Sequence, residues 1–501
     1  MRGPAGGAVN RESSAGMASA NGSLTVERSE LPPKQRLTAL CDPGSFNAIR
    51  QEVRSTRLGE RARAGDGVVG GAGKIEGRPI FCYAQDARFL GGSLGKAQSG
   101  TITQVLKLAG QRRAPIVSFI ESGGARMQEG LEALAGYGEI FSHNIALSGR
   151  VPQISVISGV SAGGASYSPA LTDFVLMTRR ASMFLTGPAI VKEVLGEDVS
   201  FEQLGGHSVH SRNGVCHLVA DDDIHSISLV RELLSYLPQN AWELPPERPA
   251  RKPLEHEPGQ VVPSNSRHAY DVRDVIRCLV DGGEMFELSR LWAPNIVIAF
   301  ARIDGMVVGL VANQPKRLAG VLDENASQKA ARFVRTCNSF GLPLVVLVDT
   351  PGFMPGSERE RAGVIRHGAK LLYAFGEATV PKITVILRKA YGGAYISMNS
   401  KSLGAHWTFA WENAEIGIMG ASQAVGVLHR RELASASDPE QVAKQLSAAY
   451  AAEHLTARGA AQAGHVDEVI EPVRMRARVS ATLAALGTGT HNPGGGGNIP
   501  L

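Results

Sequence analysis

The 501-residue sequence is poor in cysteine, and its five cysteines, Cys41, Cys82, Cys216, Cys278 and Cys337, are odd in number and far apart. This spacing excludes a disulfide framework and a Cys-x-x-Cys zinc site, and it indicates a reducing compartment. The chain also lacks an apolar run of the roughly 18 to 20 residues that a membrane helix needs, and it lacks a charged-then-apolar signal segment. We therefore expect a cytoplasmic protein with no membrane partner.

The sequence also lacks a large excess of either charge: it has 52 Lys and Arg residues and 47 Asp and Glu residues, for a formal net charge of +5. So small an excess, interspersed along the chain, excludes the basic stripe of a protein that binds nucleic acid. This small net charge is still compatible with a phosphorylated small molecule as a ligand. Glycine, by contrast, is abundant, with 58 residues beside a hydrophobic fraction of 43%. This composition indicates a soluble globular α/β protein with many tight turns.

The length exceeds what one compact core holds, so we expect two domains of roughly 200 residues each, plus tails. Residues 1–30 are largely Gly, Ala, Ser and Asn, which predicts a disordered tail. Seven prolines between Pro238 and Pro263 predict a linker over residues 238–266. The first domain then spans residues 31–237 and the second spans residues 267–487. Residues 488–501 favour no regular element, and we predict a poorly ordered C-terminal tail.

The most informative feature is an internal repeat. In both halves, short apolar runs rich in β-branched residues alternate with helix-compatible stretches, which indicates βα layering. Segment 152–157 resembles segment 381–386 at an offset of 229 residues, and the same offset carries Gly123 onto Gly352. It also relates three pairs of small residues: Gly163 with Gly392, Gly164 with Gly393, and Ala165 with Ala394. A constant offset across separate motifs predicts duplicated domains; chance similarity of two glycine turns is the weaker alternative.

The repeated Gly pairs follow apolar strands and precede helix-compatible stretches. Glycine lets a ligand approach the backbone closely, and a helix start leaves N–H groups without partners. Such amides form an oxyanion hole for a developing enolate or tetrahedral oxygen. For a single Gly pair, a tight turn with close packing would be the preferred interpretation. Because the pair recurs at the same place in both halves, we predict two oxyanion holes in one enzyme.

Three other motifs resemble functional sites. Residues 159–163 have the Gly-x-Ser-x-Gly pattern of a serine hydrolase, but the repeat places Ala390 at the position of Ser161. Residues 349–352 resemble a GTPase switch, but no phosphate loop precedes them. One histidine cluster could hold zinc, but no Glu lies at helix spacing between a pair of its members, so packing or loop roles are favoured for His207, His210 and His217.

Taken together, the motifs resemble one family: the carboxyltransferase (β) subunits of biotin-dependent acyl-CoA carboxylases of the propionyl-CoA and acetyl-CoA carboxylase type. The resemblance runs from about Leu37 to Leu501. In the first half it is carried by Glu-Ser-Gly-Gly-Ala-Arg-Met-Gln-Glu-Gly at 121–130 and by residues 162–173. In the second half it is carried by residues 349–353, 366–370 and 388–395, the last reading Arg-Lys-Ala-Tyr-Gly-Gly-Ala-Tyr.

The resemblance implies an α/β fold of two crotonase-like domains, built from ββα units and related by tandem duplication. It implies a hexamer of two stacked trimeric rings, with each active site between the N-terminal domain of one subunit and the C-terminal domain of another. The region before Leu37 does not look like the family's first helices, which leaves docking at that end open. The four-cysteine zinc ribbon of one bacterial branch is absent.

The resemblance also implies which partners and cofactors the chain needs. No Met-Lys-Met biotin-attachment site and no ATP-grasp domain occur in the sequence. A separate biotinylated α subunit must therefore supply carboxybiotin. Coenzyme A enters as part of the acyl-CoA substrate, and no metal is implied. The family's chemistry needs no protein nucleophile or general base, because backbone amides stabilise the negative charge that both reacting carbonyls gain.

The site residues follow from the same resemblance. Gly163 and Gly164 would hold the thioester carbonyl of the acyl-CoA. Gly393 and Ala394 would hold the ureido carbonyl of biotin, together with Gly392. Further residues are expected to contact the acyl-CoA substrate: Gly123, Gly124, Ala125, Arg126, Tyr167 and Ile396.

Ile396 bears on the choice of substrate. Propionyl-CoA-selective relatives commonly carry Asp at this position, at the mouth of the acyl pocket. An apolar side chain discriminates only by contact with methylene groups, at about 0.8 kcal/mol each, so its selectivity is modest. We therefore expect carboxylation of acetyl-, propionyl- and butyryl-CoA to malonyl-type products. A mere packing role for Ile396 is the alternative.

Three other functions stay open at this point. The chain could be the carboxyltransferase subunit of a biotin-dependent acyl-CoA decarboxylase, which runs the reaction in reverse with a membrane pump as partner. It could be a non-catalytic paralogue that scaffolds a carboxylase complex, although a scaffold has no need of two Gly pairs. A crotonase-type hydratase would need acidic residues beside the first pair, and none occurs in residues 161–169.

Overall fold

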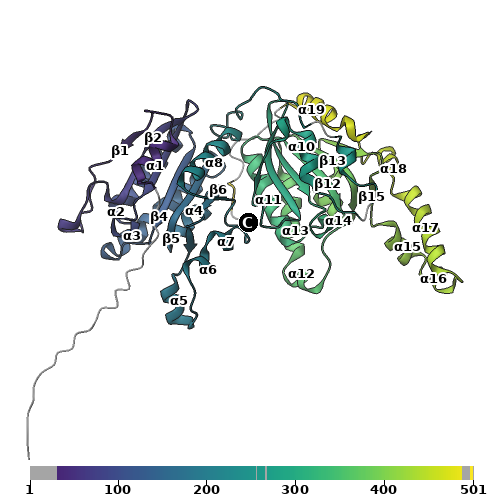
Figure 1. Cartoon of the computed structure of the whole chain (residues 1–501), viewed down its shortest axis with the longest axis horizontal. Coiled ribbons are helices and arrows are strands. Elements are labelled where there is room, and N and C mark those ends of the chain that lie inside the picture. Colours follow the sequence, from purple (N-terminus) through teal and green to yellow (C-terminus); the bar gives the residue numbers. More distant parts are fainter. Residues whose placement is uncertain (1–30, 255–256, 266–267, 488–496, 500–501) are drawn as a thin grey trace, which may run out of the picture.

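The computed structural model (Figure 1) describes residues 31–254, 257–265, 268–487 and 497–499. The predicted disordered tail, residues 1–30, lies outside the described residues, as do residues 488–496 of the predicted C-terminal tail. Two mixed β-sheets, one from each half of the chain, lie side by side with helices on their faces. No helix within the described ranges is both long and apolar enough to cross a membrane.

The first sheet has the strand order β1-β2-β3-β4-β5-β6-β8, with β7 paired to β5. Its first two pairings are antiparallel and the later ones are parallel. The strands are β1 (Asn47–Ile49), β2 (Val68–Ile75), β3 (Arg78–Gln85), β4 (Ile116–Ser122), β5 (Gln153–Ala162), β6 (Phe174–Thr178), β7 (Ser182–Phe184) and β8 (Leu218–Ala220).

The helices of this half are α1 (Pro33–Leu40), α2 (Lys96–Arg112), α3 (Leu131–Leu147), α4 (Gly164–Ala170), α5 (Pro188–Leu195), α6 (Phe201–Gly205), α7 (His207–His210) and α8 (Asp223–Tyr236). Apolar side chains of α2 and α3 pack on one face of the sheet, and those of α1 and α8 pack on the other. Both faces of β4 are therefore covered, which explains why a continuous apolar run forms this strand.

The second sheet repeats the arrangement as β9-β10-β11-β12-β13-β14-β16, with β15 paired to β13. Its strands are β9 (Met285–Leu288), β10 (Ile296–Ile303), β11 (Met306–Asn313), β12 (Leu344–Thr350), β13 (Lys382–Tyr391), β14 (Trp407–Trp411), β15 (Glu415–Gly417) and β16 (Glu468–Ile470). The order and directions of the strands match those of the first sheet, so the predicted duplication is confirmed.

The remaining helices are α9 (Pro258–Val261), α10 (Val272–Leu279), α11 (Glu324–Ser339), α12 (Ser357–Arg361), α13 (Val364–Glu377), α14 (Gly392–Ser397), α15 (Ala421–Leu428), α16 (Arg430–Ser435), α17 (Pro439–His454), α18 (Ala457–Gln462) and α19 (Met475–Leu486). Apolar residues of α10 and α19 cover one face of the second sheet. Those of α11 and α13 cover the other face and join a core that continues into the first half.

Aromatic side chains fill the junction between the halves. The Phe174 and Phe300 rings lie edge to face with centroids 6.1 Å apart, and the Tyr236 ring stacks on Phe300 at 6.2 Å. In the folded chain the α1 and α8 face of the first sheet thus turns toward the α11 and α13 face of the second. One continuous apolar core therefore joins the two domains.

The register of the sheets corrects one detail of the repeat. Ser122 pairs with Ser161 and Thr350 pairs with Ala390, so Ser122 and Thr350 are equivalent at an offset of 228. Gly352 therefore corresponds to Gly124, and the predicted pairing of Gly352 with Gly123 is wrong. The reason is that the segment joining β12 to β13 is one residue longer than the segment joining β4 to β5. Beyond it the offset of 229 holds.

Candidate functional site

The first Gly pair lies where β5 turns into α4. Gly163 has φ +59° and ψ −127°, a conformation that favours glycine, and its N–H donates to the Phe184 carbonyl at 3.0 Å. Gly164 is the first residue of α4, and no side chain caps this helix start. The first N–H groups of α4 are thus left for an outside acceptor. We call residues 162–165 the first amide turn.

The loop after β4 lies against this turn. Gly124 has φ +100°, and a Cβ built on it would lie 3.2 Å from the Ala162 carbonyl oxygen. Its N–H donates to Ser122 Oγ at 3.2 Å, and its carbonyl accepts from the Leu94 N–H at 2.8 Å. Gly123 is exposed and Ala125 is half-buried. Three of the predicted residues thus lie on a loop that adjoins the first amide turn.

The second Gly pair repeats this geometry where β13 turns into α14. Gly392 has φ +57°, close to the value for Gly163, and α14 again begins without a capping side chain. Gly393 is exposed, whereas Ala394 is fully buried. Thr350 Oγ1 accepts the Gly352 N–H at 3.3 Å, as Ser122 does for Gly124 in the first half. We call residues 391–394 the second amide turn.

Two predicted side chains lie one helical turn beyond the amide turns. Tyr167 on α4 is 52% exposed, and its ring meets the Phe141 ring edge to face at 6.2 Å. Ile396 on α14 is 43% exposed and occupies the equivalent place in the second half. Their equivalence was not foreseen from the sequence. The exposure of both side chains leaves each free to contact a ligand or another subunit.

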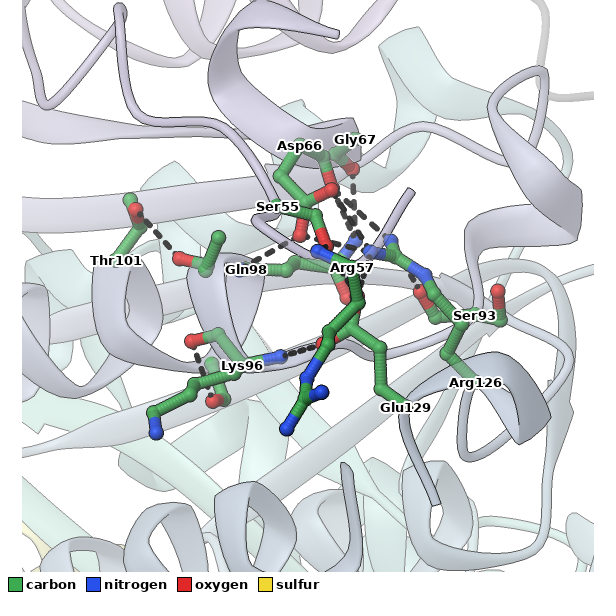
Figure 2. Close-up of polar contacts among 12 residues, drawn as sticks. Ser55, Arg57, Asp66, Gly67, Ser93, Lys96, Gln98, Thr101, Arg126 and Glu129 are labelled. Atoms are coloured by element: carbon green, nitrogen blue, oxygen red, sulfur yellow. Dashed lines mark hydrogen bonds and ion pairs between the residues drawn. The ribbon is translucent and has the colours of Figure 1, made fainter. Parts of the chain in front are cut away.

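Arg126 points into the protein rather than toward the amide turn. Its side chain is fully buried and donates to Asp66 at 2.8 and 2.9 Å, to Glu129 at 2.8 Å and to the Ser93 carbonyl at 2.9 Å. Figure 2 shows this guanidinium enclosed by its acceptors. Burial raises the pKa of Asp66 despite the opposing effect of Arg126. The structure thus connects Arg126 to the loop that it anchors, while direct substrate contact stays a prediction.

Glu129, which accepts from Arg126, also lines a basic cleft of about 690 Å³. Burial alone would raise the pKa of Glu129, but hydrogen bonds from the Lys96 N–H at 2.7 Å and Ser55 Oγ at 2.7 Å, together with Arg126, lower it. Three carboxylates and four exposed cationic side chains line the cleft: Glu129, Glu132, Glu139, Arg50, Arg54, Arg57 and Lys96. The Arg57 and Lys96 side chains each lie 3.6 Å from Glu132.

Sequence reasoning missed the aromatic side chains behind the turns. A Cβ on Gly164 would lie 2.8 to 3.0 Å from ring atoms of Tyr137, which belongs to α3. A Cβ on Gly393 would lie 3.7 Å from the Phe353 ring, an ordinary contact. Tyr137 precedes Gly164 by 27 residues, and no local pattern links the two. Only the packing of α3 on the sheet brings them together.

The serine and histidine motifs, which the sequence itself argues against as sites, form no site in the structure either. Ser161 is fully buried within β5, and its Oγ has no hydrogen-bond partner. His210 Nε2 lies 2.6 Å from the Met183 carbonyl, and His217 Nδ1 accepts the Val175 N–H at 3.0 Å. Within the described ranges, no group of three or more His, Cys, Asp or Glu side chains could hold a metal ion. The backbone thus satisfies His210 and His217, whereas His207 Nδ1 is buried without a hydrogen-bond partner.

The fold and the two amide turns define the class of the protein: tandem α/β domains in which a central parallel strand ends, each time, in an uncapped Gly-Gly turn. A model of the carboxyl transferase domain matches residues 26–493. The chain belongs to the carboxyl transferase family. It is a carboxyltransferase subunit, and the predictions of family, crotonase-like fold and enzymatic carboxyl transfer are confirmed.

The chain is similar to relatives of three kinds, named as carboxylase, decarboxylase and transcarboxylase proteins. The chain is 46% identical to the propionyl-CoA carboxylase beta chain of Roseobacter denitrificans, over 92% of this chain and 91% of the relative. It is also 46% identical to the methylmalonyl-CoA decarboxylase subunit alpha of Veillonella parvula, over 94% and 93%. A crystal structure of transcarboxylase 12S, a hexamer assembly with methylmalonyl-CoA and methylmalonic acid bound, aligns with TM-score 0.89 and 46% identity, over 94% of this chain and 92% of that chain.

Proposed function

We propose that this chain moves a carboxyl group from carboxybiotin, carried on a separate biotinylated α subunit, to the α-carbon of a short-chain acyl-CoA. The observation that carries the proposal is the pair of amide turns with matching geometry, one in each domain. Two carbonyl oxygens gain negative charge in such a transfer, one on the biotin ring and one on the thioester. One uncapped amide turn is available for each.

The proposed roles follow the predicted assignment. Gly163 and Gly164 orient the thioester carbonyl and stabilise its enolate form, while Gly393 and Ala394 bind the ureido carbonyl of biotin. Biotin, when bound, supplies the carboxyl group and the ring that accepts the α-proton. The second turn suits this group, because Gly393 is exposed and a Cβ built on it would meet only the Phe353 ring, at 3.7 Å. The further proposed contacts with the acyl-CoA beside the first turn are those of the predicted assignment: Gly123, Gly124, Ala125 and Tyr167.

The basic cleft extends the proposed substrate site. Gly136 lines the cleft, and its neighbour Tyr137 packs against the first amide turn, so one helix, α3, borders both. Coenzyme A carries several phosphate charges at the end remote from its thioester. We assign these phosphates to the exposed cationic side chains of the cleft, where charge-assisted hydrogen bonds to phosphate are strong.

The proposal includes an assembly. The transcarboxylase 12S structure is a hexamer, and this chain aligns with 92% of that chain. We propose that this chain also forms a hexamer in which the first amide turn of one subunit faces the second amide turn of another. All five cysteines are free thiols, which supports the proposed cytoplasmic location. Copurification with a biotinylated protein, detected with avidin, tests the partner directly.

A second candidate is the same transfer in the decarboxylating direction. The equal identity to a carboxylase beta chain and to a decarboxylase subunit favours neither direction. The direction therefore rests on the partner, either an ATP-dependent biotin carboxylase or a membrane decarboxylase. Identification of the copurifying biotinylated complex by mass spectrometry separates these two cases.

The decisive test of the two turns is Gly393→Val. This position has room for a side chain, so the variant is expected to fold while its side chain blocks the approach of the biotin carbonyl. Loss of an oxyanion donor typically lowers kcat about 10²- to 10³-fold. Steady-state assay of the reconstituted complex, with light scattering as a check on assembly, measures this. Ser161→Ala is the matched control and should keep near-normal turnover. A Gly393→Val enzyme of normal size and normal turnover would refute the assignment.

Gly164→Val is a less direct test, because its Cβ would collide with the Tyr137 ring. Loss of activity in that variant would have two causes, a blocked site and disturbed packing, which the assay does not separate. The two glycines thus differ in what a substitution reports, although the sequence presents them as equivalents.

The acyl chain range is tested at Ile396. Its 43% exposure beside the second amide turn supports the proposed contact with the acyl group. We expect the rates on acetyl-, propionyl- and butyryl-CoA to differ by no more than roughly tenfold to 200-fold for each added methylene group, which is the range that methylene contacts allow. Ile396→Asp should narrow the profile toward propionyl-CoA. A wild-type enzyme that uses propionyl-CoA alone, or a variant with an unchanged profile, removes Ile396 from the specificity argument.

A further inference from the structure

One buried side chain packs against the first amide turn and, through the Ser122 side chain, is connected to the loop beside it. Tyr137 lies on α3, is 4% exposed, and places ring atoms 2.8 to 3.0 Å from the position that a Cβ on Gly164 would occupy. Its ring therefore packs directly against the backbone at the start of α4. Because Gly164 lacks a side chain, nothing separates the ring from the backbone that carries the first N–H groups of the helix.

The hydroxyl group of the same residue reaches the other segment. Tyr137 Oη lies 3.3 Å from Ser122 Oγ, and Ser122 Oγ accepts the Gly124 N–H at 3.2 Å. Gly124 in turn lies close to the Ala162 carbonyl, immediately before the turn. A chain of contacts thus runs from Tyr137 through Ser122 to the loop after β4. Ring and hydroxyl together connect the two segments whose amides border the site.

The second domain holds its turn differently. Thr350 replaces Ser122, and its hydroxyl donates to the Gly352 carbonyl at 3.3 Å, within its own loop. The ring near Gly393 belongs to Phe353, which has no hydroxyl group and lies on the loop after β12. In the described part of the second domain, the aromatic contact therefore comes from the loop itself. The Tyr137 connection distinguishes the first site from the second.

We propose that Tyr137 is a positioning residue for the amides of the first turn: its ring sets the start of α4 and its hydroxyl, through Ser122, sets the Gly124 loop. This inference rests on the proposed function, in which the first turn receives the thioester carbonyl. Burial raises the pKa of Tyr137 to about 12, so the hydroxyl keeps its proton at the pH of any ordinary assay. The contribution is accordingly the same at pH 6 and at pH 9.

The test is Tyr137→Phe, which removes the hydroxyl and keeps the ring. We expect kcat with acyl-CoA to fall about threefold to tenfold, with the KM for free biotin unchanged, because the second turn is untouched. Ser122→Ala should give a similar loss, and the double variant should lose little more than either single variant, since both changes break one connection. Tyr236→Phe, which removes a hydroxyl from another buried tyrosine, is the matched control and should behave as wild type.

A binding measurement separates positioning from general damage. By calorimetry, wild type should bind acetyl-CoA more tightly than S-ethyl-CoA, a thioether that lacks the carbonyl group. Tyr137→Phe should lose part of this preference while it binds the thioether normally. The inference would be overturned if Tyr137→Phe kept both a normal kcat and the normal preference for acetyl-CoA over the thioether. A rise in the KM for biotin as large as the fall in kcat would also overturn it. Failure of the proposed function is distinguishable, because wild type would then show no carboxyl transfer and no preference.

Discussion

At the scale of single residues, Arg126, which is predicted to contact the substrate, is fully buried among acceptors of its own chain. Its guanidinium is enclosed by Asp66 and Glu129, whose side chains are as inaccessible to solvent as its own. The Phe89 ring lies under it at 5.5 Å. A cation in this position offsets two carboxylates that burial alone would disfavour. Its hydrogen bonds tie the loop of residues 123–130 to Asp66 and to the Ser93 carbonyl.

We predict that Arg126→Met strongly destabilises the chain. The substitution leaves Asp66 and Glu129 without their buried cation, and breaking such a pair typically costs about 3 to 5 kcal/mol of unfolding free energy. Chemical denaturation monitored by circular dichroism measures the loss. Arg57→Met is the control: Arg57 is exposed and lies 3.6 Å from Glu132, so it should cost less than about 1 kcal/mol. Equal effects of the two variants would contradict the prediction.

At the scale of elements, the C-terminal segment 497–499 ties the two domains together. Asn498 Nδ2 donates to Thr336 Oγ1 at 2.8 Å and to Asp173 Oδ1 at 3.3 Å, and its own N–H donates to Ser148 Oγ at 2.8 Å. Arg332 donates to the Ile499 carbonyl at 3.0 Å. These contacts hold three residues of the segment for which composition predicts poor order. Composition predicted it because it considers only local preference, whereas long-range hydrogen bonds hold the segment.

Asp173, at this junction, makes stability depend on pH. Burial raises its pKa from the ordinary 3.8 to about 6, against the Gln153 N–H, Asn498 and Arg332, which favour the charged form. Between about pH 4 and 6 the folded chain therefore holds this proton more tightly than the unfolded chain. The stability from this carboxyl group is fully present below about pH 4 and is lost as the pH rises through 6.

We predict that Asp173→Asn removes this loss. As the pH rises from 4 to 7, the unfolding free energy of the variant should increase relative to that of wild type by on the order of 3 kcal/mol, because an amide does not ionise. Urea denaturation of both proteins across this range measures the difference. The difference between the two proteins should change through pH 6 and be flat above pH 7. A constant difference at every pH would show that Asp173 does not titrate as described.

At the scale of the whole molecule, matching arms extend from both domains. Helix α5 has no buried residue, and Figure 1 shows it and α15 to α17 projecting beyond the sheets. Val194 on α5 is 71% exposed and Leu428 on α15 is 66% exposed. Exposed apolar clusters on projecting helices are typical of surfaces that another protein covers. The arms fit the contacts that the proposed hexamer requires.

We predict that Val194→Glu and Leu428→Glu each weaken the hexamer, since a carboxylate would be buried without a partner at the subunit contact. Size-exclusion chromatography with light scattering should show smaller species, and carboxyl transfer should fall with assembly, because each active site of the proposed hexamer needs two subunits. Leu244→Glu is the matched control, an exposed leucine of the linker that should leave assembly unchanged. Intact hexamers in both arm variants would place the subunit contacts elsewhere.

The sequence by itself determined the duplication, the class of fold and the two Gly pairs, because strand–helix periodicity and glycine at positive φ are local properties that a repeat displays twice. Local pattern did not determine what lies behind each turn. Tyr137 against Gly164, Arg126 between Asp66 and Glu129, and Asn498 across the domain junction all join residues distant in the chain. The one-residue change of offset between Gly124 and Gly352 likewise emerged only from strand register. These contacts were decided by the tertiary structure, since they arise from helices packing on sheets and from one sheet packing beside the other.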